Sequence, residues 1–378
     1  MENLKYNLSI LQEKAKERTV KTQSVEYDIE TLVKKIEKNI IKLDPEYQRR
    51  HRWDNTTSSR LIESLILNIP IPTVYISQDV DVDVETNSEE FRYSVIDGQQ
   101  RLTAIKNFLK NKYALEGLES LDELNGCFYK DLPPFLTRRL EERSIKCLRI
   151  DSTLDSQIKL DIFERLNSGS VKLESQELRN AVFNGKFNNL IKELSQNINF
   201  RELLQINTDS PENNNKVKKM EDVEIVLRFF ALVNDRYNRF KKTKEKGFSN
   251  FLDESLEEFN NYSDKIISKM KIDFEKTMHF INTVFGNTMF SKYKFSEDSQ
   301  ELRLQSKFNI AVYDSFAIAI HDALAEGINI NNKKQDLLEL FYSNEFYDSI
   351  SGSYLDTNKL KYRIETAKRV LGCQETLL

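Results

Sequence analysis

The residues with the clearest chemical potential lie in YSVIDGQQRLTAIKNFL, residues 93–109. The apolar first part predicts a strand that ends at Ile96, and the spacing of the later apolar residues predicts a helix directly afterwards. A helix N-terminus carries unpaired backbone N–H groups and a partial positive charge. The pattern therefore predicts an anion-binding turn. Five residues make up this turn: Asp97, Gly98, Gln99, Gln100 and Arg101.

Several of these residue types suit a phosphate. Gly98 leaves room for a phosphate to approach the backbone, Arg101 can bind it with two parallel hydrogen bonds, and Thr103 can add a hydroxyl. The competing interpretation is structural, with Asp97 as a helix cap, Gly98 as a turn residue and solvated glutamines. The first turn of a helix ordinarily favours acidic residues, so two glutamines and an arginine there favour a ligand site.

Hydrolysis of a nucleoside triphosphate (NTP) would need an in-line water and neutralised phosphate charge. Gln99 or Gln100 could orient that water, and Asp97 would repel phosphate unless it caps the helix or shares a Mg²⁺ ion. Mg²⁺ is thus compatible with the site without being required. No GxxxxGK[ST] motif occurs, which excludes the common phosphate-loop class. Three arginines could neutralise phosphate: Arg49, Arg101 and Arg165.

Two further segments carry candidate ligands. In PEYQRRHRW, residues 45–53, Gln48 and Arg49 place donors near Trp53, a combination that suits phosphate and base together. A basic surface loop with Trp53 in the core is the alternative. In FERLNSGS, residues 163–170, Arg165 and Asn167 end a predicted helix before a glycine turn, either as a plain helix end or as part of the site.

The segment VIDGQQRLTAI resembles the signature of the N-terminal domain of GmrSD-type restriction systems. The resemblance spans residues 25–205, and its departures from the family pattern are Gly169-Ser170 for Gly-Gly and Glu174-Ser175 for Asn-Pro. Three further elements occur in the family's order. Two precede the motif, DPEYQRRHRWD at 44–54 and LIESLILNIPIPTVYI at 61–76, and one comes after it, IFERLNSGSVKLESQELRNA at 162–181.

This resemblance implies a fold like that of ParB and sulfiredoxin, in which the corresponding turn binds nucleotide phosphates. It implies that Gln48 and Arg49 face the ligand and that the loop with Arg165 and Asn167 borders the same pocket. It also implies a place in a bacterial restriction or anti-phage system. Such proteins often carry a second, histidine-dependent nuclease domain.

Histidine and cysteine usage limits the chemistry. The histidines are His51, His279 and His321; the last two lie on predicted apolar helices, with no aspartate pairing or second histidine expected nearby. We expect both in the core or on a helix surface, and a nuclease supplied by another chain. The three cysteines lie far apart and contain no CxxC, which argues against a zinc ribbon or a disulfide framework.

The composition limits which classes of protein the chain can belong to. The 378 residues carry 56 basic and 60 acidic side chains, a net charge of −4, so a globally basic nucleic-acid binder is not favoured. A local cluster at 236–246 keeps a DNA contact open through Arg239, Lys241 and Lys242. A solvated helix end is the favoured interpretation, because acidic residues follow closely at 253–258. No apolar run approaches the ~20 residues of a membrane span, and no cleavable leader is evident. We expect a cytoplasmic protein without a membrane contact.

Element patterns indicate an α+β chain. Short strands alternate with helices in a ParB/sulfiredoxin-like domain over residues 1–206. We expect its strands at 24–29, 39–43, 72–78, 91–96 and 144–150, an N-terminal helix at 4–18, and further helices at 29–39, 57–68, after the turn at 97–101, and at 155–168. The apolar spacing of Leu61, Ile62, Leu65 and Ile66 marks the buried side of the helix at 57–68.

The Asn-rich stretch 207–220 around Pro211 is the expected linker, and residues 221–378 have the periodicity of an all-α helical domain. Its helical segments are expected at 221–240, 249–285, 306–326, 333–349 and 357–371.

The leading hypothesis is a nucleotide-binding, NTP-hydrolysing sensor or regulatory subunit of a restriction or anti-phage system, working with a partner nuclease or another defence protein. Two alternatives stay open: a non-catalytic DNA-binding module, and a weak nuclease within the ParB-like domain. The oligomeric state is left open.

Overall fold

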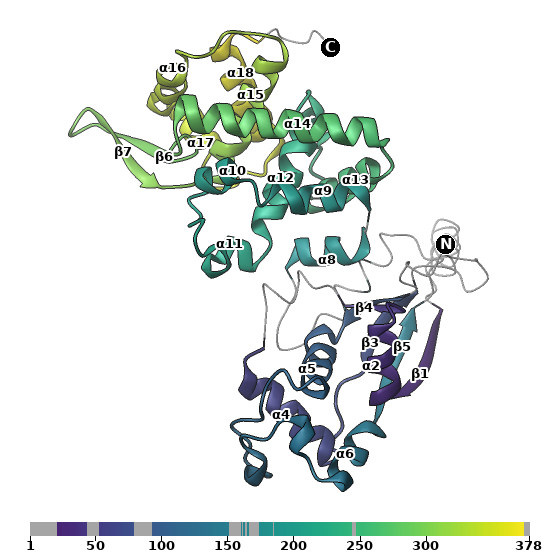
Figure 1. Cartoon of the computed structure of the whole chain (residues 1–378). Helices are drawn as coiled ribbons and strands as arrows, with labels where there is room; N and C mark the ends of the chain where they lie inside the picture. The colour runs from purple at the N-terminus through teal and green to yellow at the C-terminus, as the bar shows by residue number, and fades with distance from the viewer. Residues whose placement is uncertain are drawn as a thin grey trace, which may run out of the picture. The chain divides into compact units, whose positions relative to one another are not determined.

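The computed structural model describes residues 21–43, 53–78, 93–150, 160, 162, 165, 174–183, 185–243 and 247–373 (Figure 1). The chain divides into two compact units, Met1–Leu173 and Glu174–Leu378. The expected N-terminal helix over residues 4–18 falls outside the described residues, as do Gln48, Arg49, His51 and Asn167.

The first unit is built on a mixed five-stranded sheet with the order β1-β5-β3-β4-β2. The pairs β1–β5 and β3–β4 are antiparallel, whereas β3–β5 and β2–β4 are parallel. The strands lie where the sequence predicted them. Their bounds are β1 Thr22–Asp28, β2 Ile41–Lys42, β3 Val74–Gln78, β4 Tyr93–Asp97 and β5 Ser144–Ile150.

The main helices of this unit are α2 Ile29–Glu37, α4 Asn55–Ile66, α5 Gln99–Leu109 and α6 Pro134–Glu141. In α4, Asp54 caps the N-terminus by accepting the Thr57 N–H at 2.7 Å. The helix buries Leu61, Ile62, Leu65 and Ile66, the stripe that the apolar spacing predicted. These side chains join Val74, Ile76, Val95, Ile105 and Phe108 in one core.

The second unit is mostly helical (Figure 1). Helix α15 is its centre, with Ala311 to Ala323 all buried, and it packs against α12, α14 and α18. The helices are α8 Ser175–Val182, α9 Lys186–Leu194, α10 Ile198–Leu203, α11 Asn215–Lys218, α12 Glu221–Leu232, α13 Phe248–Asn260, α14 Asp264–Phe280, α15 Ile310–Ala325, α16 Lys334–Glu339, α17 Asn344–Ser349 and α18 Thr357–Leu371. The α+β class with a helical C-terminal part is therefore confirmed.

The stretch 207–220 differs from the expected linker. The division of the chain comes after Leu173, and 207–220 lies inside the second unit, where Pro211–Asn213 forms a 3₁₀-helix and Asn215–Lys218 forms α11. Val217 and Met220 are buried there. These two buried apolar side chains hold an otherwise polar segment in the second unit, and the composition of the segment did not reveal them.

The helical region also contains a β-hairpin that the helical periodicity did not predict. Strand β6, Lys292–Ser296, pairs antiparallel with β7, Glu301–Ser306, as a separate two-stranded sheet (Figure 1). Its aromatic face packs on the 3₁₀-helix Leu340–Tyr342, with Tyr293 5.5 Å from Phe341 and Phe295 5.1 Å from Tyr342 between ring centroids.

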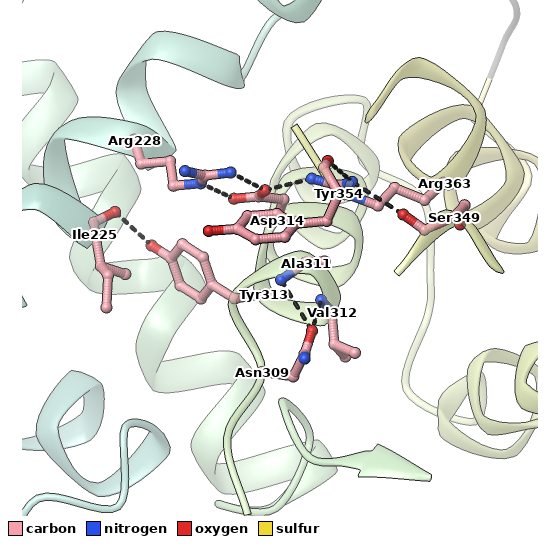
Figure 2. A network of polar contacts seen from close by, with 10 residues as sticks. All are labelled: Ile225, Arg228, Asn309, Ala311, Val312, Tyr313, Asp314, Ser349, Tyr354 and Arg363. Atoms are coloured by element: carbon pink, nitrogen blue, oxygen red, sulfur yellow. Dashed lines mark hydrogen bonds and ion pairs between the residues drawn. The ribbon is translucent and has the colours of Figure 1, made fainter. Parts of the chain in front are cut away.

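A buried ionic network joins three helices of this unit. Figure 2 shows Asp314 of α15 between Arg228 of α12 and Arg363 of α18. The Asp314 Oδ2 atom lies 2.5 Å from Arg228 Nη2 and 2.6 Å from Arg363 Nη2. Arg363 also donates to the carbonyls of Ser349 and Tyr354. One carboxylate thus serves two guanidinium groups in the interior.

Candidate functional site

The predicted strand–turn–helix unit is confirmed. Strand β4 ends at Asp97, Gly98 adopts a left-handed conformation with φ 101°, and α5 begins at Gln99. A Cβ atom on Gly98 would lie 2.9 Å from Val74 Cγ2 and 3.3 Å from Arg101 Nη2. Backbone conformation and close packing therefore both require glycine here, independently of any ligand.

Arg101 is already engaged by the protein itself. Its guanidinium is buried, with Nη2 2.8 Å from Asp97 Oδ2 and Nη1 donating to the carbonyl of Pro72. The Thr73 carbonyl lies 3.4 Å from both terminal nitrogens. Arg101 thus ties the first turn of α5 to the segment that enters β3. A phosphate contact by Arg101 stays a prediction.

This pairing resolves the expected repulsion between Asp97 and phosphate. Asp97 neither caps α5 nor needs a cation from solution, because Arg101 supplies the opposite charge four residues later. The turn therefore presents a neutral ion pair at the helix N-terminus, rather than an isolated carboxylate.

Replacing Arg101 with alanine should lower the free energy of unfolding by about 1–3 kcal/mol without any ligand, because the Pro72 and Thr73 carbonyls lose their donor. An Arg101 that served only to bind a ligand would leave the ligand-free stability nearly unchanged. Urea denaturation measures it. Lys110→Ala on the same helix breaks the exposed pair with Glu37 and should cost under about 1 kcal/mol. Equal losses in the two variants would contradict the structural role.

The remaining turn residues also have protein partners. Gln99 Nε2 donates to the Val95 carbonyl at 3.1 Å, and Thr103 Oγ1 donates to the Gln99 carbonyl at 2.7 Å. Gln100 Oε1 accepts the Trp53 backbone N–H at 3.3 Å. Trp53 packs against the core, as one of the two interpretations of the sequence expected.

The described residues on either side of 44–52 both contact this unit. Before the segment, β2 runs parallel to β4, with Ile41 beside Tyr93 and Lys42 beside Ser94. After it, the Trp53 N–H is bound by Gln100. Gln48 and Arg49 lie within the segment and outside the described residues.

The downstream element 162–181 is divided between the two units. Arg165 is exposed, whereas Arg179 at the other end of the element is 1% exposed inside the second unit. Arg179 donates from Nε to Asp253 at 2.6 Å, from Nη1 to Glu224 at 2.7 Å and from Nη2 to Ser249 at 2.6 Å. It therefore joins α8 to α12 and α13. The sequence did not reveal this residue, because its partners in α12 and α13 lie at least 45 residues further along the chain.

Where the basic cluster at 236–246 is described, its two arginines form ion pairs. Arg236 and Arg239 both contact Glu258, at 2.9 and 3.1 Å, and the Tyr262 hydroxyl donates to the same carboxylate. Lys241 and Lys242 are exposed, and residues 244–246 lie outside the described residues. The role of Arg239, Lys241 and Lys242 in binding DNA stays a prediction.

Glu258 should give the unfolding free energy a defined acid dependence. Hydrogen bonding from Arg236, with Tyr262 and the charge of Arg239, lowers its pKa from 4.5 to about 2. A lowered folded-state pKa means stabilisation that is complete above pH 4.5 and is lost as the pH falls toward about 2. Glu258→Gln should remove this component in acid titrations of stability. Glu257→Gln is the matched control, and identical pH profiles for Glu258→Gln and wild type would contradict the assignment.

One histidine differs from expectation. His279 is exposed on α14, but buried His321 has its Nδ1 atom 2.8 Å from Oδ1 of Asp322, whose Oδ2 binds Lys368 at 2.9 Å. The expectation that neither histidine has an aspartate partner was wrong for His321. Adjacent helical residues do not ordinarily face each other, so the sequence did not suggest this pair.

The three cysteines are free, and burial raises the pKa of Cys147 to about 11 and of Cys373 to about 11. Within the described ranges no three His, Cys, Asp or Glu side chains gather as a metal-binding group. Among the same residues no helix combines the length and apolarity needed to cross a membrane.

The mixed sheet and the Asp-Gly-Gln-Gln-Arg turn define an α+β domain with a strand–turn–helix unit. Residues 29–184 match the model of the family described as the GmrSD restriction endonuclease, N-terminal domain. This part of the chain is therefore a GmrSD N-terminal domain, a domain of restriction systems. No curated protein and no solved structure significantly matches the chain. The match runs from α2 to just beyond α8, so it crosses the division after Leu173.

Proposed function

We propose that the GmrSD N-terminal domain of this chain binds an NTP at the N-terminus of α5 and hydrolyses it. The observation that carries this proposal is the chemistry of the turn. Gly98, as N-cap, offers no side-chain acceptor, and the first turn of α5 has no acidic residue. The neighbouring carboxylate, Asp97, is neutralised by Arg101. The positive end of the helix dipole therefore suits an external anion such as phosphate.

Each remaining candidate has a proposed role. Gln48 and Arg49 would approach the phosphates, because the described residues on either side of their segment contact β4 and α5. Gln99 or Gln100 would orient the attacking water. Arg101 would act mainly by holding Asp97 and the turn in place. Arg165 and Asn167 would complete the site from the downstream element, and Mg²⁺ would offset phosphate charge.

Gln100→Glu is the sharpest test of nucleotide binding. The substitution keeps the shape and the acceptor that holds the Trp53 N–H. It adds a negative charge where the helix dipole favours one, so thermal stability should stay equal or rise. The same charge should repel phosphate and weaken NTP binding about tenfold or more. Isothermal titration with each NTP, together with thermal melts, measures both effects.

Asn107→Asp is the matched control, because it adds the same charge further along α5, away from the turn. It should leave NTP affinity unchanged. If the wild-type chain binds no NTP, or if Gln100→Glu and Asn107→Asp bind equally, the site is not at this turn. If the chain does bind an NTP, measuring phosphate release with and without DNA shows whether the bound NTP is also hydrolysed.

The role proposed for the whole chain is that of a sensor or regulator whose nuclease is another protein. It rests on the restriction-system family of the domain and on nucleotide binding. The same purified chain should therefore leave DNA intact with Mg²⁺ or Mn²⁺. Cleavage abolished by Asp97→Ala would favour a nuclease in the first unit. Cleavage abolished by His321→Ala would move the activity to the second unit.

A further inference from the structure

The β6–β7 hairpin has two open edges of different character. It forms a two-stranded sheet, so among the described residues each strand has a neighbour on one side only. The hairpin extends from the helical unit in Figure 1. Open strand edges present backbone donors and acceptors to other strands, and proteins ordinarily protect them with charge.

The edge of β6 is protected in this way. Two such edges paired antiparallel about Tyr293 would set Lys292 of one copy against Lys294 of the other. Like charges directly opposite each other destabilise a strand pair. Strand β6 also lies against the 3₁₀-helix Leu340–Tyr342, which further restricts its access.

The edge of β7 is instead complementary to itself. Its sequence with the following residue is ELRLQSK, residues 301–307. In an antiparallel pair centred on Leu304, Glu301 of each copy faces Lys307 of the other. Arg303 faces Gln305, and Leu304 faces Leu304. Opposing residues share a face in this register, so each of these pairs can form contacts.

Neighbouring registers lack this match. Moving the axis to residue 303 pairs Arg303 with itself, and moving it to residue 305 pairs Arg303 with Lys307. A slip by one residue sets Arg303 against Leu304 and reverses the faces. Among these neighbouring registers, the charge pattern therefore favours the one centred on Leu304.

The side chains on this edge are free to make such contacts. Leu304 is 52% exposed, and Glu301, Arg303 and Lys307 are exposed. Within the described parts of the chain no ion pair involves Glu301, Arg303 or Lys307. Within the hairpin, Arg303 instead stands opposite Lys294, a like-charged neighbour. A second copy would supply Arg303 with an amide oxygen and Glu301 with a cation.

We propose that a second copy of this chain docks on β7, forming a two-fold symmetric dimer through an antiparallel β7–β7 pair centred on Leu304. The two hairpins then make one four-stranded sheet with β6 at both outer edges. Addition of a strand to an open edge is a recurrent mode of association, and two-fold pairing is the commonest symmetry of homodimers. The proposal is independent of nucleotide binding.

Charge reversal with rescue tests this dimer. In a homodimer of Glu301→Lys, the new lysine of each copy faces Lys307 of the other copy. In a homodimer of Lys307→Glu, the new glutamate of each copy faces Glu301 of the other copy. Each single variant should weaken dimerisation at least about tenfold. The double variant restores opposite charges, and so does an equimolar mixture of the two single variants. Sedimentation equilibrium from about 1 to about 100 µM chain measures the dissociation constants.

Glu297→Lys, in the turn between the strands, is the control with the same charge change outside the pair, and it should dimerise as wild type does. Circular dichroism checks that each variant is folded. A wild-type chain that stays monomeric over the whole range overturns the proposal. Single variants that dimerise like wild type, or a mixture that does not regain affinity, overturn it as well.

Discussion

Replacing Asp314 with alanine should lower the free energy of unfolding by about 3–5 kcal/mol. Asp314 is fully buried and is bound by Arg228 and Arg363, which are 3% and 0% exposed. Without the carboxylate, two guanidinium groups remain in the interior with no anion between them. An uncompensated buried charge costs far more than the loss of a hydrogen bond. Urea denaturation followed by circular dichroism measures the loss.

Two further variants separate charge from packing. Asp336→Ala breaks the exposed pair with Lys333 and should cost under about 1 kcal/mol. The triple change Asp314→Leu, Arg228→Met and Arg363→Met replaces the network with apolar side chains and should recover much of the stability. If Asp314→Ala is no worse than Asp336→Ala, the network does not hold α12, α15 and α18 together.

Arg179→Met should destabilise the second unit by a similar amount, about 3–5 kcal/mol. Arg179 makes ion pairs with Asp253, which is 2% exposed, and with Glu224, and it binds Ser249. Its removal takes the guanidinium away from the buried Asp253 carboxylate. Arg179→Lys keeps the charge but not the planar fork, so it should fall between wild type and Arg179→Met. Thermal and urea unfolding of the three proteins test this order.

The loss in Arg179→Met should also depend on pH. Loss of a neighbouring cation raises the pKa of a buried carboxyl group, so the folded variant takes up a proton more readily than the folded wild type does. The stability gap to wild type should therefore shrink as the pH falls. Lys186→Met, which breaks the exposed pair with Asp264, is the matched control and should cost under about 1 kcal/mol. If Arg179→Met loses no more stability than Lys186→Met, Arg179 does not anchor α8 to α12 and α13.

Much of the fold was predictable because its signals are local. Strand β5 and helix α18 have the predicted bounds, Ser144–Ile150 and Thr357–Leu371. The turn at Gly98 was predictable because an apolar run, a glycine and a helical period follow one another directly. The motif around it also indicated the family that residues 29–184 match.

The partners of charged side chains were not predictable in this way. Arg101 read as a phosphate ligand, yet its guanidinium binds Asp97 and the carbonyl of Pro72, 29 residues away. The sequence did not single out Arg179, whose partner Asp253 lies 74 residues later in the chain. A charged residue gives the same local signal whether it is solvated or paired in the interior.

Most strands and helices, the strand–turn–helix unit at Gly98 and the restriction-system domain follow from local signals in the sequence, because periodicity, breakers and motif spacing act over a few residues. The packing of 207–220 within the helical unit and the pairing of β6 with β7 emerge only in the folded chain. The same is true of the carboxylate that each buried arginine meets. Burial of an ion depends on partners brought together by the whole fold, since an unpaired charge in the interior is too costly to persist.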